Sequence, residues 1–189
     1  YGVEVLDRDA ALAQDHTPVW AVIRNALARM EAKNGPYDYV VLLEATSPLR
    51  TPGSVDQALP LLEARPDADG IIAVSKYQFN PAWNSFTTNE SGFLKYLVDQ
   101  GTGVGPWRRQ MVPECWHHSG ELYIWRSDFV RKHHLGYTAG YFLPYETPWQ
   151  QAFSFDELAE FEFAEKLVSA GIVKLPWLSD KLVTVGDRK

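Results

Sequence analysis

Short apolar runs recur along the chain, and each is followed by polar residues. Residues 38–43 and 70–74 are stretches of β-branched and apolar side chains, which are typical of strands buried on both faces. Residues 2–6 and 121–125 have the same character, and residues 141–144 predict one more short strand. Strands of this kind occur where helices cover both sides of a sheet. The apolar runs therefore predict the strands of a covered sheet.

Apolar residues at helical spacing fill the segments between these strands. One helix is predicted from an N-cap at Asp15 or Thr17 to Asn34, and a second begins at Ser54. Residues 156–170 carry the clearest apolar stripe, which predicts a third helix. Strands that alternate with helices indicate an α/β fold with a mostly parallel sheet covered by helices.

Residues 75–112 interrupt this alternation, because aromatic side chains lie there among Asn, Gly and Pro. This pattern predicts short antiparallel strands and long loops. We expect one domain over residues 1–189, with a β-rich subdomain inserted at about residues 75–112. So small a segment cannot easily bury its own aromatic residues, and interfaces are enriched in them, so we predict a homodimer that uses this subdomain. The aromatic residues concerned are Trp83, Phe86, Phe93, Tyr96 and Trp107.

Composition narrows the classes of partner. The chain has 189 residues, 46% of them hydrophobic, and a formal net charge of −6 at pH 7. Broad electrostatic binding to nucleic acid or to an anionic membrane is therefore not expected. No apolar run reaches the roughly 18–20 residues of a membrane span. Cys115 is the single cysteine, which excludes an internal disulfide and fits the reducing cytoplasm.

The predicted strand at residues 38–43 leads into the polar turn TSPLR at residues 46–50. Open α/β sheets bind ligands just beyond the carboxyl ends of their strands. Pro48 restricts the backbone, so the turn can present hydroxyl and main-chain groups over the edge of the sheet. The turn is a candidate substrate site; the alternative is a structural turn in which Arg50 braces the loop.

Three stretches resemble the signatures of one family, in the same order along the chain. RDAALAQD at residues 8–15 resembles R-P-x-x-L-A-x-D, and LLEATSPLR at residues 42–50 resembles L-L-Q-P-T-S-P-L-R. Residues 109–123 begin with Arg-Gln and end with Ser-Gly-x-x-Tyr, which resembles R-Q-x-x-P-x-x-Y-x-x-N-G-x-x-Y. Together they resemble the acylneuraminate cytidylyltransferases, the CMP-sialic acid synthetase family.

The resemblance implies a Rossmann-like nucleotidyltransferase fold and a homodimeric cytoplasmic enzyme. Such an enzyme joins the 2-hydroxyl of an acidic 2-keto sugar to the α-phosphate of CTP and releases pyrophosphate, with Mg²⁺ or Mn²⁺ on the phosphates. The expected partners are therefore CTP and a sialic-acid-like or other 2-keto acid sugar.

The resemblance also implies roles for individual residues. Nucleotide contacts are expected at Arg8 and Thr17, and Asp156 is the expected metal ligand and catalytic carboxylate. The alternatives are a solvated Arg8, an N-cap at Asp156, and a basic surface pair formed by Arg108 and Arg109. Contacts to the sugar are expected from Glu44, Thr46, Ser47, Arg50, Arg109, Gln110, Ser119 and Gly120.

Three positions depart from the family's pattern. Glu44 stands where the family has Gln, Ser119 replaces Asn, and Ser154 replaces the first aspartate of an I-D-I-D motif, which leaves Asp156. An ionised carboxylate cannot donate a hydrogen bond, and it repels an acidic sugar. Glu44 therefore indicates a sugar without the usual amide pattern, or one that brings an amine to this point.

In the family a Gly/Ser/Lys-rich loop near the start of the chain holds the triphosphate, and no such loop precedes Arg8 here. We therefore expect the chain to lack its N-terminal strand and phosphate loop and to be inactive by itself. Two functions remain open. One is a CTP-dependent cytidylyltransferase, and the other is a non-catalytic or degenerate binding or assembly module on the same fold.

Overall fold

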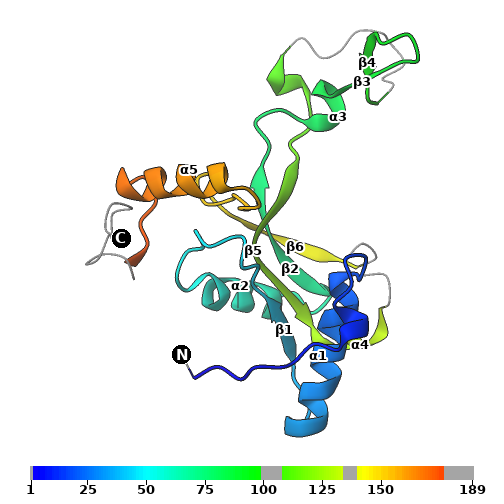
Figure 1. The fold of residues 1–189 in the computed structure, drawn as a ribbon, viewed down its shortest axis with the longest axis vertical. Helices are drawn as coiled ribbons and strands as arrows, with labels where there is room; N and C mark the ends of the chain where they lie inside the picture. The colour runs from blue at the N-terminus through cyan, green and yellow to red at the C-terminus, as the bar shows by residue number, and fades with distance from the viewer. Residues whose placement is uncertain (1, 99–107, 134–139, 177–189) are drawn as a thin grey trace.

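A computed structural model describes residues 2–98, 108–133 and 140–176 of the chain. Its main sheet has four strands in the order β1-β5-β2-β6, and helices lie on both faces (Figure 1). The predicted α/β class is therefore confirmed. The strands are β1 Tyr39–Leu42, β2 Gly70–Lys76, β5 Trp116–Arg126 and β6 Phe142–Glu146.

The sheet is mixed, which corrects the prediction of a mostly parallel sheet. β6 runs parallel to β2, whereas β5 is antiparallel to both of its neighbours, β1 and β2. The chain leaves the sheet at Lys76 and returns at Trp116, which pairs with Lys76. Because this connection returns to the end of the sheet that it left, β5 must run against β2; parallel neighbours need a crossover to the opposite end.

The helices begin near the predicted positions. No helix among the described residues is long and apolar enough to cross a membrane. α2 begins at Ser54, as predicted. The α-helices are α1 Val19–Asn34, α2 Ser54–Glu63, α3 Pro81–Asn84, α4 Ser127–Lys132 and α5 Leu158–Ser169, and the 3-10 turns are η1 Ala10–Leu12 and η2 Arg109–Met111.

One predicted helix cap is wrong, and the alternative of an N-cap at Asp156 is not what the structure shows. α1 begins directly after the extended residue Pro18, and its start has no side-chain cap from Asp15 or Thr17. The N-cap of α5 is Glu157 rather than Asp156. Glu157 has the extended backbone that a cap position requires, and its side chain accepts a hydrogen bond from the first turn of α5.

The core has two layers because alternate residues of a strand face opposite sides of the sheet. Tyr123 and Trp125 of β5 pack with α1 and α4. Leu122 and Ile124 of the same strand pack with α2. A third, smaller cluster joins Leu49, which follows β1, to α5. Both faces of the sheet are thus covered, as the apolar runs predict.

Residues 2–6 are not a strand, contrary to the prediction. Residues 2–5 are exposed, with 76% of Val3 and 82% of Val5 accessible to solvent, and the segment pairs with no strand among the described residues. The segment lies along α1 instead, through an ion pair between Glu4 and Lys33. β-branched composition alone does not make a strand, because a strand also needs a neighbour with which to form hydrogen bonds.

The connection between β2 and β5, residues 77–115, is called the arm here. Its described part contains α3 and a hairpin of β3 (Phe86–Thr88) and β4 (Leu94–Tyr96), and it projects away from the sheet (Figure 1). The antiparallel strands expected in this region are therefore present, and Phe86 and Tyr96 stack across them. Trp107 lies outside the described residues. The use of the arm as a dimer interface stays a prediction.

Candidate active site

The turn at residues 46–51 follows β1 and lies against the end of the sheet. Ser47 is buried, and its N–H donates to the carbonyl oxygen of Glu44 at 3.1 Å. On the other side, the carbonyl oxygen of Thr46 accepts from the N–H of Phe155 at 2.8 Å. The turn is therefore held between the sheet and the segment that leads into α5, so its position is well defined.

Arg50 braces this turn. Its Nη2 donates to the carbonyl oxygen of Glu44 at 2.7 Å, and its Nε donates to the carbonyl oxygen of Glu121 at 3.2 Å. Burial lowers the pKa of Arg50, while the charges of Glu121 and Glu44 oppose that shift. The bracing role that the sequence left as an alternative is thus present. A contact between Arg50 and the sugar stays a proposal.

Gly120 of β5 lies very close to the turn. Its φ is +71°, which favours glycine, and a Cβ placed there would overlap Ser47 Oγ and lie 2.7 Å from Glu44 Oε2. Ser47 Oγ also donates to the carbonyl oxygen of Ser119 at 3.4 Å. Residues 44, 47, 119 and 120, all expected to contact the sugar, are therefore gathered in one place.

Glu121 belongs to the same cluster, although the sequence interpretation did not include it. Only 1% of its surface is exposed. Its Oε1 accepts from the N–H of Thr51 at 3.2 Å, and its Oε2 accepts from the hydroxyl of Thr147 at 2.7 Å. A charged residue inside the apolar run ELYIW was the available signal, because such a residue is rarely buried without partners.

The segment after β6, residues 147–156, is joined to the turn by further contacts. Thr147 Oγ1 lies 3.2 Å from Ser119 Oγ. The amide nitrogen of Gln151 donates to the carbonyl oxygen of Leu49 at 3.0 Å. The turn, β5 and this segment therefore form one connected polar cluster at the carboxyl ends of β1 and β6.

Asp156 lies at the end of this segment, with an exposed carboxylate. Its Oδ2 accepts from the hydroxyl of Ser154 at 3.4 Å. The described residues contain no group of three or more His, Cys, Asp or Glu side chains that could hold a metal ion. A hard cation that is also bound to phosphate oxygens needs only one or two protein carboxylates. Glu157 and not Asp156 caps α5, so the Asp156 carboxylate is not used for capping. It therefore fits the role of a single protein ligand to such a cation.

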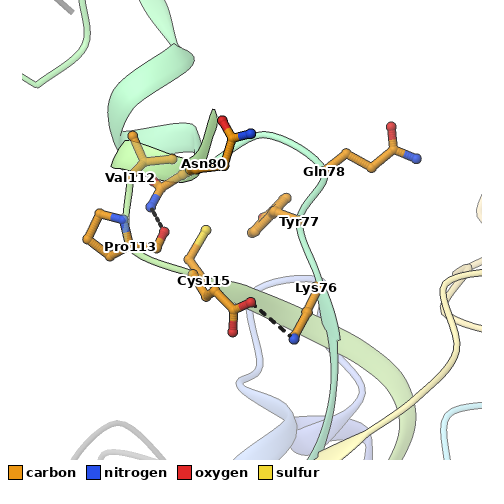
Figure 2. A pocket seen from close by; sticks show the side chains of 9 residues that line it. Lys76, Tyr77, Gln78, Asn80, Val112, Pro113 and Cys115 are labelled. Atoms are coloured by element: carbon orange, nitrogen blue, oxygen red, sulfur yellow. Dashed lines mark hydrogen bonds and ion pairs between the residues drawn. The ribbon is translucent and has the colours of Figure 1, made fainter. Parts of the chain in front are cut away.

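Gln110 lies apart from the cluster, in the arm. It lines a hollow of about 480 Å³ together with Lys76, Tyr77 and Cys115 (Figure 2). Across this hollow Lys76 forms an ion pair with Glu114. Arg109, the other expected sugar contact of this region, begins η2. Its side chain is outside the described part of the structure.

A second hollow, of about 580 Å³, adjoins the cluster directly. It is lined by Lys76 and Tyr77 on one side and by Glu146, Thr147 and Trp149 on the other. Thr147 belongs to both this hollow and the polar cluster, since its hydroxyl donates to Glu121. The hollow therefore borders the cluster at Thr147, a residue that is itself buried.

Arg8 and Thr17, the expected nucleotide contacts, are not gathered into the cluster. Arg8 is exposed in the extended segment that precedes η1. The N–H of Thr17 donates to the carbonyl oxygen of Gln14 at 2.9 Å, in the turn before α1. Nucleotide binding by these two residues therefore stays a prediction.

No protein-family model matches the chain. A post-translational flagellin modification protein B from Campylobacter coli is 28% identical over 172 residues, which cover 89% of this chain and 69% of that protein. A pseudaminic acid cytidylyltransferase from Campylobacter jejuni is 25% identical over 166 residues, which cover 85% of this chain and 66% of that enzyme. The chain thus spans about two thirds of each curated relative. One relative is thus named as a cytidylyltransferase for pseudaminic acid and the other as a flagellin modification protein, and neither is named as an acylneuraminate enzyme.

Proposed function

We propose that the chain provides the sugar-binding part of a cytidylyltransferase, which transfers CMP from CTP to an acidic 2-keto sugar and releases pyrophosphate. The observation that carries the proposal is the convergence of Glu44, Ser47 and Gly120 at the carboxyl ends of β1 and β6, the edge of a sheet at which α/β proteins bind ligands. The cytidylyltransferase named among the relatives supports the type of reaction. A sialic-acid-like sugar is one member of the proposed substrate class.

In this reaction a sugar hydroxyl oxygen attacks the α-phosphorus of CTP. A new P–O bond forms, the bond between the α-phosphorus and the bridging oxygen to the β-phosphate breaks, and pyrophosphate leaves while the hydroxyl proton passes to a base or to water. Catalysis of phosphoryl and nucleotidyl transfer depends mainly on holding the two reactants in line. The cluster can do this on the sugar's side, because its hydroxyl and main-chain groups are held in place by their own hydrogen bonds.

Divalent-metal binding is part of the proposal. Asp156 would hold Mg²⁺ or Mn²⁺ together with phosphate oxygens, and the ion would supply positive charge to the phosphates during transfer. In the same proposal Thr46, Ser47 and Ser119 contact the sugar. Because Gln110 lies apart from the cluster of its own chain, Arg109 and Gln110 are proposed to reach the sugar from the arm of the second copy in a homodimer. The proposed nucleotide contacts are Arg8 and Thr17.

Glu44 is proposed to select among sugars. Its side chain is half-buried, and its Oε2 lies over Gly120 at the inner end of the cluster. A carboxylate there accepts hydrogen bonds but cannot donate them, so it favours a hydroxyl or an amine over a carbonyl oxygen. Glu44→Gln removes a charge and introduces a donor at nearly constant volume.

The proposal is tested by measuring pyrophosphate release from CTP in the full-length protein, with a panel of acidic 2-keto sugars that carry either an N-acyl group or a free amine. We expect release that depends on both the sugar and Mg²⁺. Glu44→Gln should lower the KM for N-acyl sugars relative to amine sugars and leave the KM for CTP unchanged. The exposed residue Glu162 of α5 provides the control variant, Glu162→Gln.

The second candidate function is a non-catalytic binding module on the same fold. Ser154 favours it, because a hydroxyl at this position leaves Asp156 as the single carboxylate of the motif. That function predicts that the full-length protein binds the sugar without releasing pyrophosphate under any metal condition. Calorimetry with the same sugar panel separates the two candidates.

A further inference from the structure

We propose that Glu121 is a positioning residue for this reaction. Its buried carboxylate holds the turn at residues 46–51 and the segment at residues 147–156 in one fixed arrangement. The inference rests on the proposed function for its catalytic consequence, whereas the arrangement itself is a property of the structure.

The first reason is the environment of the carboxylate. Glu121 is 1% exposed and lies in β5 next to Leu122, which packs in the core. Removing a carboxylate from water costs free energy unless hydrogen bonds replace its hydration. Both oxygens of Glu121 accept a hydrogen bond, one from the N–H of Thr51 and one from the hydroxyl of Thr147. An apolar side chain at this position would avoid the cost of burial but would hold neither donor.

The second reason is where the two donors come from. Thr51 ends the turn that carries the candidate sugar contacts, and Thr147 begins the segment that carries Asp156. These two segments lie about one hundred residues apart in the sequence. Thr51 and Gln151, whose side chains form a hydrogen bond, are separated by 100 positions. Glu121 of β5 therefore connects the turn that is proposed to contact the sugar with the segment whose Asp156 is proposed to bind the metal on the phosphates of CTP.

Charge gives the third reason. Arg50 in the turn donates to the carbonyl oxygen of Glu121, and the carboxylate of Glu121 opposes the effect of burial on the pKa of Arg50. The negative charge of Glu121 also adds to burial in raising the pKa of Tyr145. The carboxylate thus compensates the guanidinium that braces the turn, and a neutral residue removes that compensation.

Two substitutions separate shape from charge. Glu121→Gln keeps the volume, and its amide oxygen can still accept from the N–H of Thr51. Its amide nitrogen can only donate, so the hydroxyl of Thr147 must accept from it instead of donating. The Thr147 hydroxyl can then donate to the hydroxyl of Ser119, which lies 3.2 Å away. Glu121→Leu removes both acceptors.

A matched control comes from the same strand. Ile124 is fully buried and packs with α2, away from the polar cluster. Ile124→Val removes one methyl group from the core, so it lowers stability without touching either segment of the site.

The experiment uses the full-length parent protein and the three variants, with two measurements. Hydrogen–deuterium exchange followed by mass spectrometry reports on peptides that cover residues 46–54 and 147–156, and steady-state kinetics reports on kcat and KM per folded molecule. We expect Glu121→Leu to increase exchange in both peptides and to lower kcat by about 10- to 100-fold, because small misplacements of reacting groups cost this much. Glu121→Gln should show an intermediate loss of kcat, with the KM for CTP within about twofold of the parent. Ile124→Val should lower the melting temperature and leave both the exchange of these peptides and kcat unchanged.

Parent-like exchange in both peptides and a parent-like kcat in Glu121→Leu would overturn the positioning role. Absence of pyrophosphate release by the parent would overturn the proposed function instead. In that case faster exchange in both peptides still supports the arrangement, and unchanged exchange rejects it, because this readout does not depend on turnover.

Discussion

Arg50 donates a 2.7 Å hydrogen bond from Nη2 to the carbonyl oxygen of Glu44, six residues earlier in the same loop. A second bond, from Nε to the carbonyl oxygen of Glu121, fastens the loop to β5. The guanidinium is therefore engaged by the backbone on both sides. Through it, Glu44 and the turn keep one orientation relative to the sheet, which is the condition for a site that selects its ligand.

Arg50→Lys should destabilise the protein, because one ammonium group cannot reproduce two divergent guanidinium hydrogen bonds. We expect the free energy of unfolding to fall by about 1.5–3 kcal/mol, the range for hydrogen bonds to charged groups. Urea denaturation followed by circular dichroism measures this change. The control is Arg65→Lys in the exposed pair with Asp67, which should leave the free energy of unfolding nearly unchanged because water screens this pair. Equal effects of the two substitutions would contradict the bracing role.

Gly120→Ala should both destabilise the protein and displace Ser47 and Glu44, because the new Cβ would overlap Ser47 Oγ and lie 2.7 Å from Glu44 Oε2. We expect a loss of about 2–5 kcal/mol, from left-handed strain of about 1–2 kcal/mol and overpacking of about 1–3 kcal/mol. Gly92→Ala is the matched control, since Gly92 has φ +81° but a Cβ added there would meet no atom within 4 Å. Thermal melts and sugar-dependent pyrophosphate release together measure the difference; a Gly120→Ala protein as stable and as active as Gly92→Ala would refute it.

Asp156→Asn should lower Mg²⁺-dependent pyrophosphate release strongly, by about 10-fold or more, while the melting temperature stays within about 2 °C of the parent. The reason is that Glu157, not Asp156, caps α5. Glu157→Ala should show the reverse, with a loss of about 1 kcal/mol of stability from the missing cap and little change in the metal dependence. Removal of divalent ions with EDTA should abolish release in the parent. Turnover that survives Asp156→Asn would leave the carboxylate without a catalytic role.

The arm should mediate homodimer formation, because its hairpin exposes apolar side chains. Phe93 is 70% exposed and Leu94 is 72% exposed, and neither has a core of its own to pack against. We expect sedimentation velocity to show a dimer that the double variant Phe93→Glu, Leu94→Lys converts to a monomer. Ile172→Glu, at another exposed apolar position, should leave the dimer intact. A monomeric parent at high micromolar concentration would exclude this interface.

Local patterns of the chain determined most of its elements. The apolar runs at residues 38–43 and 70–74 became β1 and β2, and Ser54 begins α2, because apolar runs and helical spacing are visible in the sequence. Burial on both faces holds for β2, whereas β1 is an edge strand whose Val41 is exposed. The TSPLR turn at residues 46–50 could also be recognised as a candidate site, since its position after a strand is visible in the sequence itself.

Tertiary structure alone decided the features that join distant segments. The direction of β5 depends on where the arm returns the chain, and residues 2–6 pair with no strand in the part of the chain that the structure describes. The close approach of Gly120 to Ser47, and the hydrogen bond from Thr51 to the buried Glu121, join residues about 70 positions apart. No local periodicity encodes such contacts, because hydrogen bonding and packing across the sheet depend on which strands become neighbours and in which direction each of them runs.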